Sequence, residues 1–165
     1  GCIAWTVALN IPGAEVTGVD ISEKAVAVAS SQDFAAKIKE SGASAPKFVV
    51  ADVLAGNQTF TEGDYDLILS NPPYIMESQK SQMRVNVLNY EPSTALFVED
   101  SDPLVFYRSI AVLSRTCLSA EGEGLTEINE LLGPETQKVF SEAGFQKTDL
   151  VKDFYDKNRF VFYSK

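Results

Sequence analysis

The fold class is decided by residues Ala14–Ala25, which have the sequence AEVTGVDISEKA. The run Ala14–Ile21 is short and rich in β-branched residues, so it predicts a buried strand. Ser22 follows at once and predicts the N-cap of an alanine-rich helix that runs towards Glu40. A strand that leads directly into a helix is the repeating unit of α/β domains, so we expect strands and helices to alternate on both sides of it.

The rest of the chain continues this alternation, with Gly, Pro or polar residues at the ends of most elements. Predicted helices cover Cys2–Asn10, Pro103–Leu118 and Pro134–Ala143, and predicted strands cover Lys47–Ala51, Tyr65–Ser70, Leu125–Ile128, Phe145–Val151 and Arg159–Tyr163. Gly122 and Gly124 predict a turn before the fourth strand. Residues 75–100 show no sustained periodicity and predict a long loop.

These elements predict an α/β fold with a doubly wound, Rossmann-like sheet that binds ligands at the carboxyl ends of its strands. The last two strands are joined by a polar turn at Asp153–Asn158, so the mostly parallel sheet should have an antiparallel C-terminal edge strand. We assign residues 1–165 to one domain. Gly1 stands directly before a helix, so we expect the first strand and its Gly-rich loop to be missing from this chain.

The composition excludes several classes of function. The chain of 165 residues carries a formal net charge of −9 and contains no histidine. Histidine triads and histidine general bases are therefore excluded, and we expect no metal site. The only modest basic group, Lys37, Lys39 and Lys47, is typical of a solvated helix face near a C-terminus, so we expect no direct binding of nucleic acid. No run predicts a membrane span or a signal peptide, and Cys2 and Cys117 are typical of reduced thiols in a cytoplasmic protein.

Two carboxylates follow consecutive predicted strands. Asp20 ends the first strand, where a carboxylate commonly accepts hydrogen bonds from the ribose of an adenine cofactor, although it could equally serve the next helix as an N-terminal charge. Asp52 follows the next strand, where the adenine amino group would lie, or it simply opens a loop. Val53 would then cover the adenine ring or meet the edge of the ring through its backbone amide, and Gly1 fits the last glycine of a GxGxG loop. Two acids at consecutive strand ends favour the cofactor interpretation.

The most specific motif is Asn71-Pro72-Pro73-Tyr74, the NPPY turn, which follows the strand Tyr65–Ser70. Its prolines stiffen the turn and lack N–H groups, so the local carbonyls can face a ligand. An amide or aryl amine nitrogen is a poor nucleophile because its lone pair is delocalised. The side-chain oxygen of Asn71 and the carbonyl of Pro72 can accept both hydrogens of such an NH2 group and direct the lone pair at a methyl donor.

Tyr74 completes this interpretation by stacking on the planar group that carries the NH2. Stacking needs the ring, so we expect the hydroxyl of Tyr74 to contribute little. The alternative is that the motif is an ordinary proline-rich turn after a strand. The strand before it and the two acids upstream favour methyl transfer to a planar amide or amino nitrogen.

Several segments of the chain are similar to those of one enzyme family. They are Gly1–Ala4, Val19–Ser22, Ser70–Ile75, Tyr90–Pro92 with Ala95–Phe97, Leu104–Ile110, Glu127-Ile128 and Asp153–Arg159. In these segments the chain resembles the HemK/PrmC family of release-factor glutamine N5-methyltransferases, which have a class I methyltransferase fold. The family also has an N-terminal helical domain, which is absent from residues 1–165.

The resemblance implies the reaction and its participants. A methyl group passes from S-adenosylmethionine, which becomes S-adenosylhomocysteine, to the side-chain amide of a glutamine in a class I peptide chain release factor. Asn71 and Tyr74 would bind that glutamine. The residues that would touch the cofactor are Gly1, Asp20, Val53 and Asn71.

Three other interpretations remain open. The NPPY turn also occurs in adenine-N6 and cytosine-N4 DNA methyltransferases and in guanine-N2 RNA methyltransferases, so it indicates the chemistry and not the substrate. The acidic balance and the segment Tyr90–Phe97 favour a protein substrate. A nicotinamide-binding oxidoreductase would use Asp20 but leaves the NPPY turn without a role. A non-enzymatic binding module that keeps the fold would show no turnover.

Overall fold

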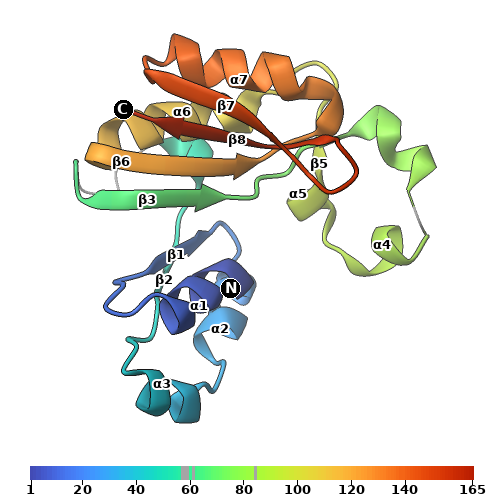
Figure 1. Cartoon of the computed structure of the whole chain (residues 1–165). Coiled ribbons are helices and arrows are strands. Elements are labelled where there is room, and N and C mark those ends of the chain that lie inside the picture. The colour runs from blue at the N-terminus through green and yellow to red at the C-terminus, as the bar shows by residue number, and fades with distance from the viewer. Residues whose placement is uncertain (57–59, 61, 84) are drawn as a thin grey trace. The chain divides into compact units, whose positions relative to one another are not determined.

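The computed structural model describes residues 1–56, 60, 62–83 and 85–165 (Figure 1). The chain forms two compact units, Gly1–Asp52 and Val53–Lys165. Each unit contains strands and helices of its own. The assignment of residues 1–165 to one domain stays a prediction.

The first unit is built around a parallel pair of strands. Its elements are α1 (Cys2–Asn10), β1 (Thr17–Asp20), α2 (Glu23–Ser30), α3 (Ala35–Ser41) and β2 (Lys47–Val50). β1 and β2 run parallel, with Asp20 opposite Val50. The buried Trp5 of α1 donates a hydrogen bond from Nε1 to the carbonyl of Ala29 at 2.9 Å, and its ring centroid lies 4.8 Å from that of Phe34. One aromatic side chain therefore contacts both α2 and the start of α3.

The helix predicted from Ser22 towards Glu40 is interrupted in the structure. Ser22 caps α2 as predicted, because its side chain accepts a hydrogen bond from a backbone amide of the first turn at 3.2 Å. The hydroxyl of Ser31 then donates to a carbonyl of α2 at 2.9 Å, and Oδ1 of Asp33 accepts from the first amide of α3 at 3.0 Å. Short polar side chains that bind the nearby backbone compete with helix continuation, which explains the break.

The second unit is built on a four-stranded sheet with the order β3-β6-β8-β7. Its strands are β3 (Tyr65–Ser70), β6 (Leu118–Glu127), β7 (Lys147–Lys152) and β8 (Asn158–Ser164), and its longer helices are α6 (Val105–Cys117) and α7 (Gly133–Glu142). β3 and β6 run parallel, whereas β8 runs antiparallel to both of its neighbours. α6 and α7 contact each other and the sheet (Figure 1). The predicted α/β sheet with an antiparallel C-terminal edge is confirmed.

Aromatic side chains form the centre of the core in this unit. Tyr163 of β8 stacks on Phe140 of α7 with ring centroids 4.2 Å apart. The hydroxyls of Tyr163 and Ser114 of α6 share a hydrogen bond of 3.0 Å. Tyr107 of α6 is fully buried as well. These rings bury a large apolar area while their polar ends stay paired, so they fix both helices to the sheet.

β6 is longer than predicted because it continues through Gly122 and Gly124, where a turn was expected. A Cβ on Gly124 would lie 2.1 Å from the ring of Tyr163, and a Cβ on Gly122 would lie 2.9 Å from the carbonyl of Tyr65. The glycines therefore make room for an aromatic ring and for the neighbouring strand. A glycine pair in a polar stretch predicts a turn equally well, which is why the prediction was wrong.

Residues 75–100 contain short elements where a long loop was predicted; residue 84 lies outside the described residues. β4 (Ile75–Met76) pairs in parallel with β5 (Phe97–Val98). Between them lie the 3-10 helix η2 (Glu77–Gln82) and the helices α4 (Val85–Tyr90) and α5 (Ser93–Leu96). The segment extends beyond the end of the sheet (Figure 1). Such short elements carry too little periodicity to be recognised in a sequence.

Candidate active site

The NPPY turn leaves the carboxyl end of β3. Pro72 is buried, Pro73 and Tyr74 are half-buried, and Asn71 is exposed. Because β3 and β6 are parallel, their carboxyl ends meet at one edge of the sheet, and this is the edge at which α/β proteins bind ligands. Within the described part of the chain, the side-chain amide of Asn71 has no hydrogen-bond partner. A ligand can therefore use it.

Three side-chain hydrogen bonds connect the end of β3 and this turn to the end of β6 and the residue Asn129 just beyond it. The hydroxyls of Ser70 and Thr126 lie 2.7 Å apart. The hydroxyl of Tyr74 donates to Oε1 of Glu127 at 2.8 Å, and Nδ2 of Asn129 donates to the carbonyl of Tyr74 at 2.9 Å. Tyr74 is thus held at both its main chain and its hydroxyl. The hydroxyl, for which sequence reasoning found no role, has a defined partner.

Asn129 lies at the centre of these contacts and is only 5% exposed. Besides the carbonyl of Tyr74, its Nδ2 binds Oε1 of Gln79 at 2.8 Å. Its Oδ1 accepts from the amide of Leu131 at 3.1 Å, which caps the 3-10 helix η3 (Glu130–Leu132). Its own amide donates to the hydroxyl of Tyr107 at 3.3 Å. Sequence reasoning missed Asn129, because an asparagine after a strand signals only a cap.

Burial and hydrogen bonding keep the hydroxyl of Tyr74 protonated. Loss of solvent and then the hydrogen bond to the Glu127 carboxylate raise the pKa of Tyr74 to about 12, although the positive charge of Arg159 opposes this shift. Tyr74 is therefore a neutral hydrogen-bond donor at physiological pH. It orients its ring and does not act as a base.

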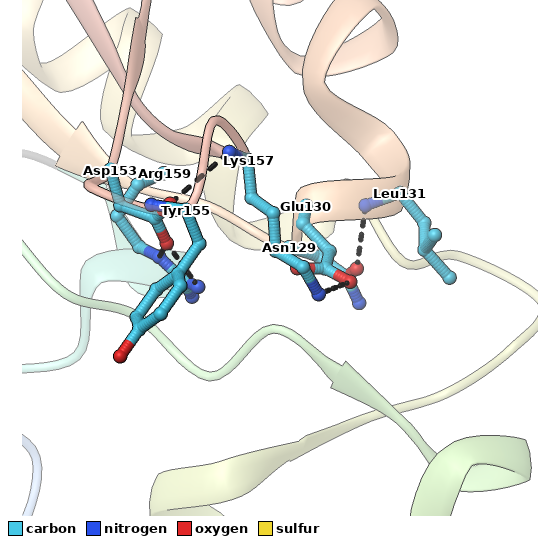
Figure 2. A network of polar contacts seen from close by, with 7 residues as sticks. All are labelled: Asn129, Glu130, Leu131, Asp153, Tyr155, Lys157 and Arg159. Carbon is cyan, nitrogen blue, oxygen red and sulfur yellow. Dashed lines mark hydrogen bonds and ion pairs between the residues drawn. The ribbon is translucent and has the colours of Figure 1, made fainter.

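A second polar network fixes the turn between β7 and β8 (Figure 2). Oδ1 of Asp153 accepts from the amides of Tyr155 at 2.8 Å and Lys157 at 3.1 Å, and Oδ2 accepts from Nη2 of Arg159 at 3.0 Å. Lys157 also pairs with Glu130 at 2.8 Å. Desolvation favours a higher pKa for Asp153, but the hydrogen bonds from Arg159 and the two amides outweigh it and lower the pKa. The carboxylate therefore stays charged and holds the turn.

A cavity of about 220 Å³ adjoins both networks, and we call it the Tyr74 cavity. Its lining residues are Tyr74, Ile75, Gln79, Met83, Asn129, Glu130 and Arg159. A larger cavity of about 350 Å³ is lined by residues of β5, the connection to α6 and α6 itself, and none of the predicted site residues lines it. The Tyr74 cavity is therefore the one that belongs to the NPPY turn.

The first unit holds three of the predicted cofactor residues. Asp20 closes β1, and Asp52 follows its parallel partner β2, so the two acids share one end of the strand pair. Oδ1 of Asp20 accepts from the amide of Ser22 at 2.8 Å, and the residue is exposed, so it serves the helix start and can still bind a ligand. A Cβ on Gly1 would lie 2.6 Å from that of Ala29, so close packing also requires glycine there.

The other predicted cofactor residues, Val53 and Asn71, belong to the second unit. Val53 begins the 3-10 helix η1 (Val53–Ala55) and packs against the core of its unit. Its place beside an adenine ring stays a prediction. Among the described residues, no group of His, Cys, Asp and Glu could hold a metal ion, and both Cys2 and Cys117 are free thiols. In the same part of the chain we find no helix with the length and apolar character of a membrane span.

One family model and several known proteins are similar in sequence to this chain. The "Methyltransferase small domain" family matches residues 1–97. A release factor glutamine methyltransferase of Flavobacterium psychrophilum is 40% identical over 161 residues, and one of Bacteroides thetaiotaomicron is 37% identical over 163 residues. Each alignment covers 98% of this chain but only 54% and 55% of the respective relative. The chain thus spans about half the length of these curated relatives.

A likeness to solved structures supports the fold. The crystal structure of TrmN from Thermus thermophilus matches 100% of this chain and 41% of its own, with a TM-score of 0.59 and 19% identity. At this identity the likeness concerns the fold alone, and it confirms the predicted fold class. The relatives confirm the resemblance predicted from the sequence. Since the family match covers residues 1–97 of 165, the chain belongs to the methyltransferase small domain family.

Proposed function

We propose that this protein transfers the methyl group of S-adenosylmethionine to the side-chain amide nitrogen of a glutamine in a class I peptide chain release factor. The observation that carries the proposal is the exposed amide of Asn71, which has no partner among the described residues, in the same turn as a Tyr74 that is fixed at two points. The relatives named release factor glutamine methyltransferase, which align with 98% of the chain, support this substrate.

An amide nitrogen is a poor nucleophile, and the NPPY turn compensates for this by orienting its lone pair. Oδ1 of Asn71 and the carbonyl of Pro72 accept its two hydrogens, so the lone pair is oriented at the methyl carbon. Bound S-adenosylmethionine supplies an electrophilic methyl group. Positioning of this kind lowers a barrier by roughly 7–11 kcal/mol at most, and the two fixed acceptors stabilise the positive charge that develops on nitrogen. With that cofactor bound, the new N–C bond would form as the S–C bond of the donor breaks, and the nitrogen would then lose a proton to water.

The contacts around Tyr74 give its ring a fixed direction. Glu127 holds the hydroxyl and Asn129 holds the carbonyl. A ring held at both points can stack on the planar glutamine amide without first losing side-chain freedom. Glu127 and Asn129 are therefore positioning residues, which act through Tyr74.

The first unit offers groups that suit the adenosine part of the cofactor. Asp20 is exposed at the carboxyl end of a parallel strand, and only its Oδ1 is used by the helix start. A carboxylate oxygen in that position suits ribose hydroxyls. Asp52 and Val53 follow the second strand, where they suit the adenine amino group and ring. Gly1 precedes α1, and the backbone amides of the first turn, which have no partner within the helix, point towards its N-terminal end at Gly1.

Methyl transfer with labelled S-adenosylmethionine tests the proposal. The protein is offered a purified class I release factor in one reaction and a DNA duplex in another. We expect label on one glutamine of the factor and none on the duplex. Label on the duplex and none on the factor would overturn the proposed substrate.

The acceptor pair is tested by Asn71→Ala. We expect kcat to fall by about 100-fold or more, with little change in cofactor affinity, because the amide acts on the reacting nitrogen. Asn10→Ala is the matched control, since the exposed Asn10 donates to the carbonyl of Thr6 in its own helix and has no other side-chain hydrogen bond within the described residues. Full activity of Asn71→Ala would contradict the mechanism.

A further inference from the structure

The Tyr74 cavity has the size of a side-chain pocket. Its volume of about 220 Å³ lies below the range of roughly 300–1,000 Å³ that small-molecule sites occupy. Tyr74 and the apolar side chains of Ile75 and Met83 form part of its lining. The cavity therefore suits one side chain of a larger ligand better than a whole cofactor.

Gln79 gives the cavity a free hydrogen-bond donor. Its Oε1 already accepts from the amide of Met76 at 3.0 Å and from Nδ2 of Asn129 at 2.8 Å. These two bonds fix the orientation of the amide. Nε2 of Gln79 has no partner within the described part of the chain. A main-chain carbonyl of a bound polypeptide is the acceptor that such a donor suits.

Two aromatic side chains of the hairpin that carries Arg159 are exposed to water. Phe154 and Tyr155, at the tip of the β7–β8 hairpin, are 106% and 85% exposed. The tip is fixed by Asp153, which binds the amides of Tyr155 and Lys157 and the side chain of Arg159 (Figure 2). Arg159 also lines the Tyr74 cavity. Because the main chain of the tip is already fixed, its backbone loses little conformational entropy when a partner covers the two rings.

The charges around the tip are already neutralised within the chain. Lys152 pairs with Asp156 at 2.9 Å, and Lys157 pairs with Glu130 at 2.8 Å. Arg159 pairs with Asp153, as described above. Nucleic-acid binding needs cations that are available to phosphates, and those of this hairpin are each occupied. The surface therefore fits a polypeptide and does not fit a phosphate backbone.

We propose that the hairpin tip Phe154-Tyr155 and the Tyr74 cavity together bind the segment of the protein substrate that flanks the acceptor glutamine. A side chain next to the glutamine enters the cavity, its main-chain carbonyl accepts from Nε2 of Gln79, and apolar side chains further along cover Phe154 and Tyr155. This inference rests on the proposed function and adds where the substrate docks.

The test compares steady-state methylation of a purified class I release factor by the wild type and by a Phe154→Ala/Tyr155→Ala double variant. We expect KM for the factor to rise about tenfold, with kcat within about twofold, because interface aromatics contribute to binding and not to the chemical step. A Phe154→Leu/Tyr155→Phe variant, which keeps most of the apolar area, should restore most of the affinity. Val112→Ala is the control, since Val112 is 65% exposed on α6 and belongs to neither network.

The outcomes separate this inference from the function on which it rests. If the wild type methylates the factor and the double variant matches the Val112→Ala control, the docking surface is refuted while the proposed function stands. If the wild type transfers no methyl group to the factor, the proposed function itself fails. Loss of binding to a DNA or RNA probe in the double variant, measured by fluorescence anisotropy at physiological salt, would show that the aromatic pair stacks on bases and would also overturn the inference.

Discussion

Replacement of Asn129 should loosen the NPPY turn and destabilise the second unit. Asn129→Ala removes the donor to the carbonyl of Tyr74 and the acceptor for the amide of Leu131. Gln79 loses one donor but keeps the amide of Met76 at 3.0 Å. Two groups are therefore left without their side-chain partner. Each such loss costs about 1–3 kcal/mol, and because both sites are only partly buried, we expect about 2–3 kcal/mol in total.

Asn129→Asp removes the hydrogen-bond donor Nδ2 but keeps the shape of the side chain, so it tests the donor alone. The aspartate keeps the acceptor for Leu131, but it places a second oxygen against the carbonyl of Tyr74 and Oε1 of Gln79, which are both acceptors. At neutral pH it should destabilise at least as much as alanine. The folded state raises the pKa of this carboxyl, so the native protein binds more protons than the unfolded chain. Stability should consequently recover as the pH falls from 7 towards about 5.

Urea unfolding followed by far-UV circular dichroism measures both effects, and methyl transfer to the release factor reports on the turn. Asn10→Ala should stay within about 0.5 kcal/mol of the wild type, as exposed substitutions generally do. An Asn129→Asp variant that is as stable as the wild type, with no dependence on pH over this range, would refute the assigned hydrogen bonds.

Three further predictions concern other parts of the second unit. Gly124→Ala should lower the free energy of unfolding by about 1–3 kcal/mol or more, because the new Cβ would lie 2.1 Å from the ring of Tyr163; an unchanged melting temperature would contradict this. An ultraviolet absorbance titration should find the phenol of Tyr74 with a pKa of about 12, so its contribution to stability is present below pH 10 and lost as the pH rises towards 12. Glu127→Gln should move that pKa down, and a wild-type value near 10 would count against the buried hydrogen bond. The carboxyl of Asp153 should titrate below its ordinary pKa of about 4 in carbon-detected NMR, so its stabilisation is complete above that pH and is lost as the pH falls through the lowered pKa.

The parts of the fold that could be predicted are those with local signals. A short apolar run predicts β3, which has the predicted bounds Tyr65–Ser70. The cap at Ser22 could be predicted from the four consecutive residues Ser22–Ala25. The long loop expected at residues 75–100 was wrong because its elements are too short for a periodic pattern. The turn expected at Gly124 was wrong because the reason for that glycine is a ring on β8, far away in sequence.

In the candidate site, too, residues with a local sequence signal could be predicted and residues brought together by the fold could not. Asn71 and Tyr74 could be named because their motif is contiguous. The residues that hold Tyr74 are separated from it by 53 positions for Glu127 and 55 for Asn129, so only the parallel pairing of β3 and β6 brings them together. Gln79 was missed for the same reason. The roles of Asp20 and Asp52 towards a cofactor stay predictions.

The buried Trp5 gives this protein a natural optical probe. It is the single tryptophan of the chain and lies in the first unit, where its indole N–H binds the carbonyl of Ala29. Its emission should shift to longer wavelength when that unit unfolds and exposes the indole to water. Helix and sheet signals come from both units. Comparing the unfolding transition seen in the emission of Trp5 with the one seen by circular dichroism would therefore show whether the unit that carries Asp20 unfolds before the unit that carries the NPPY turn.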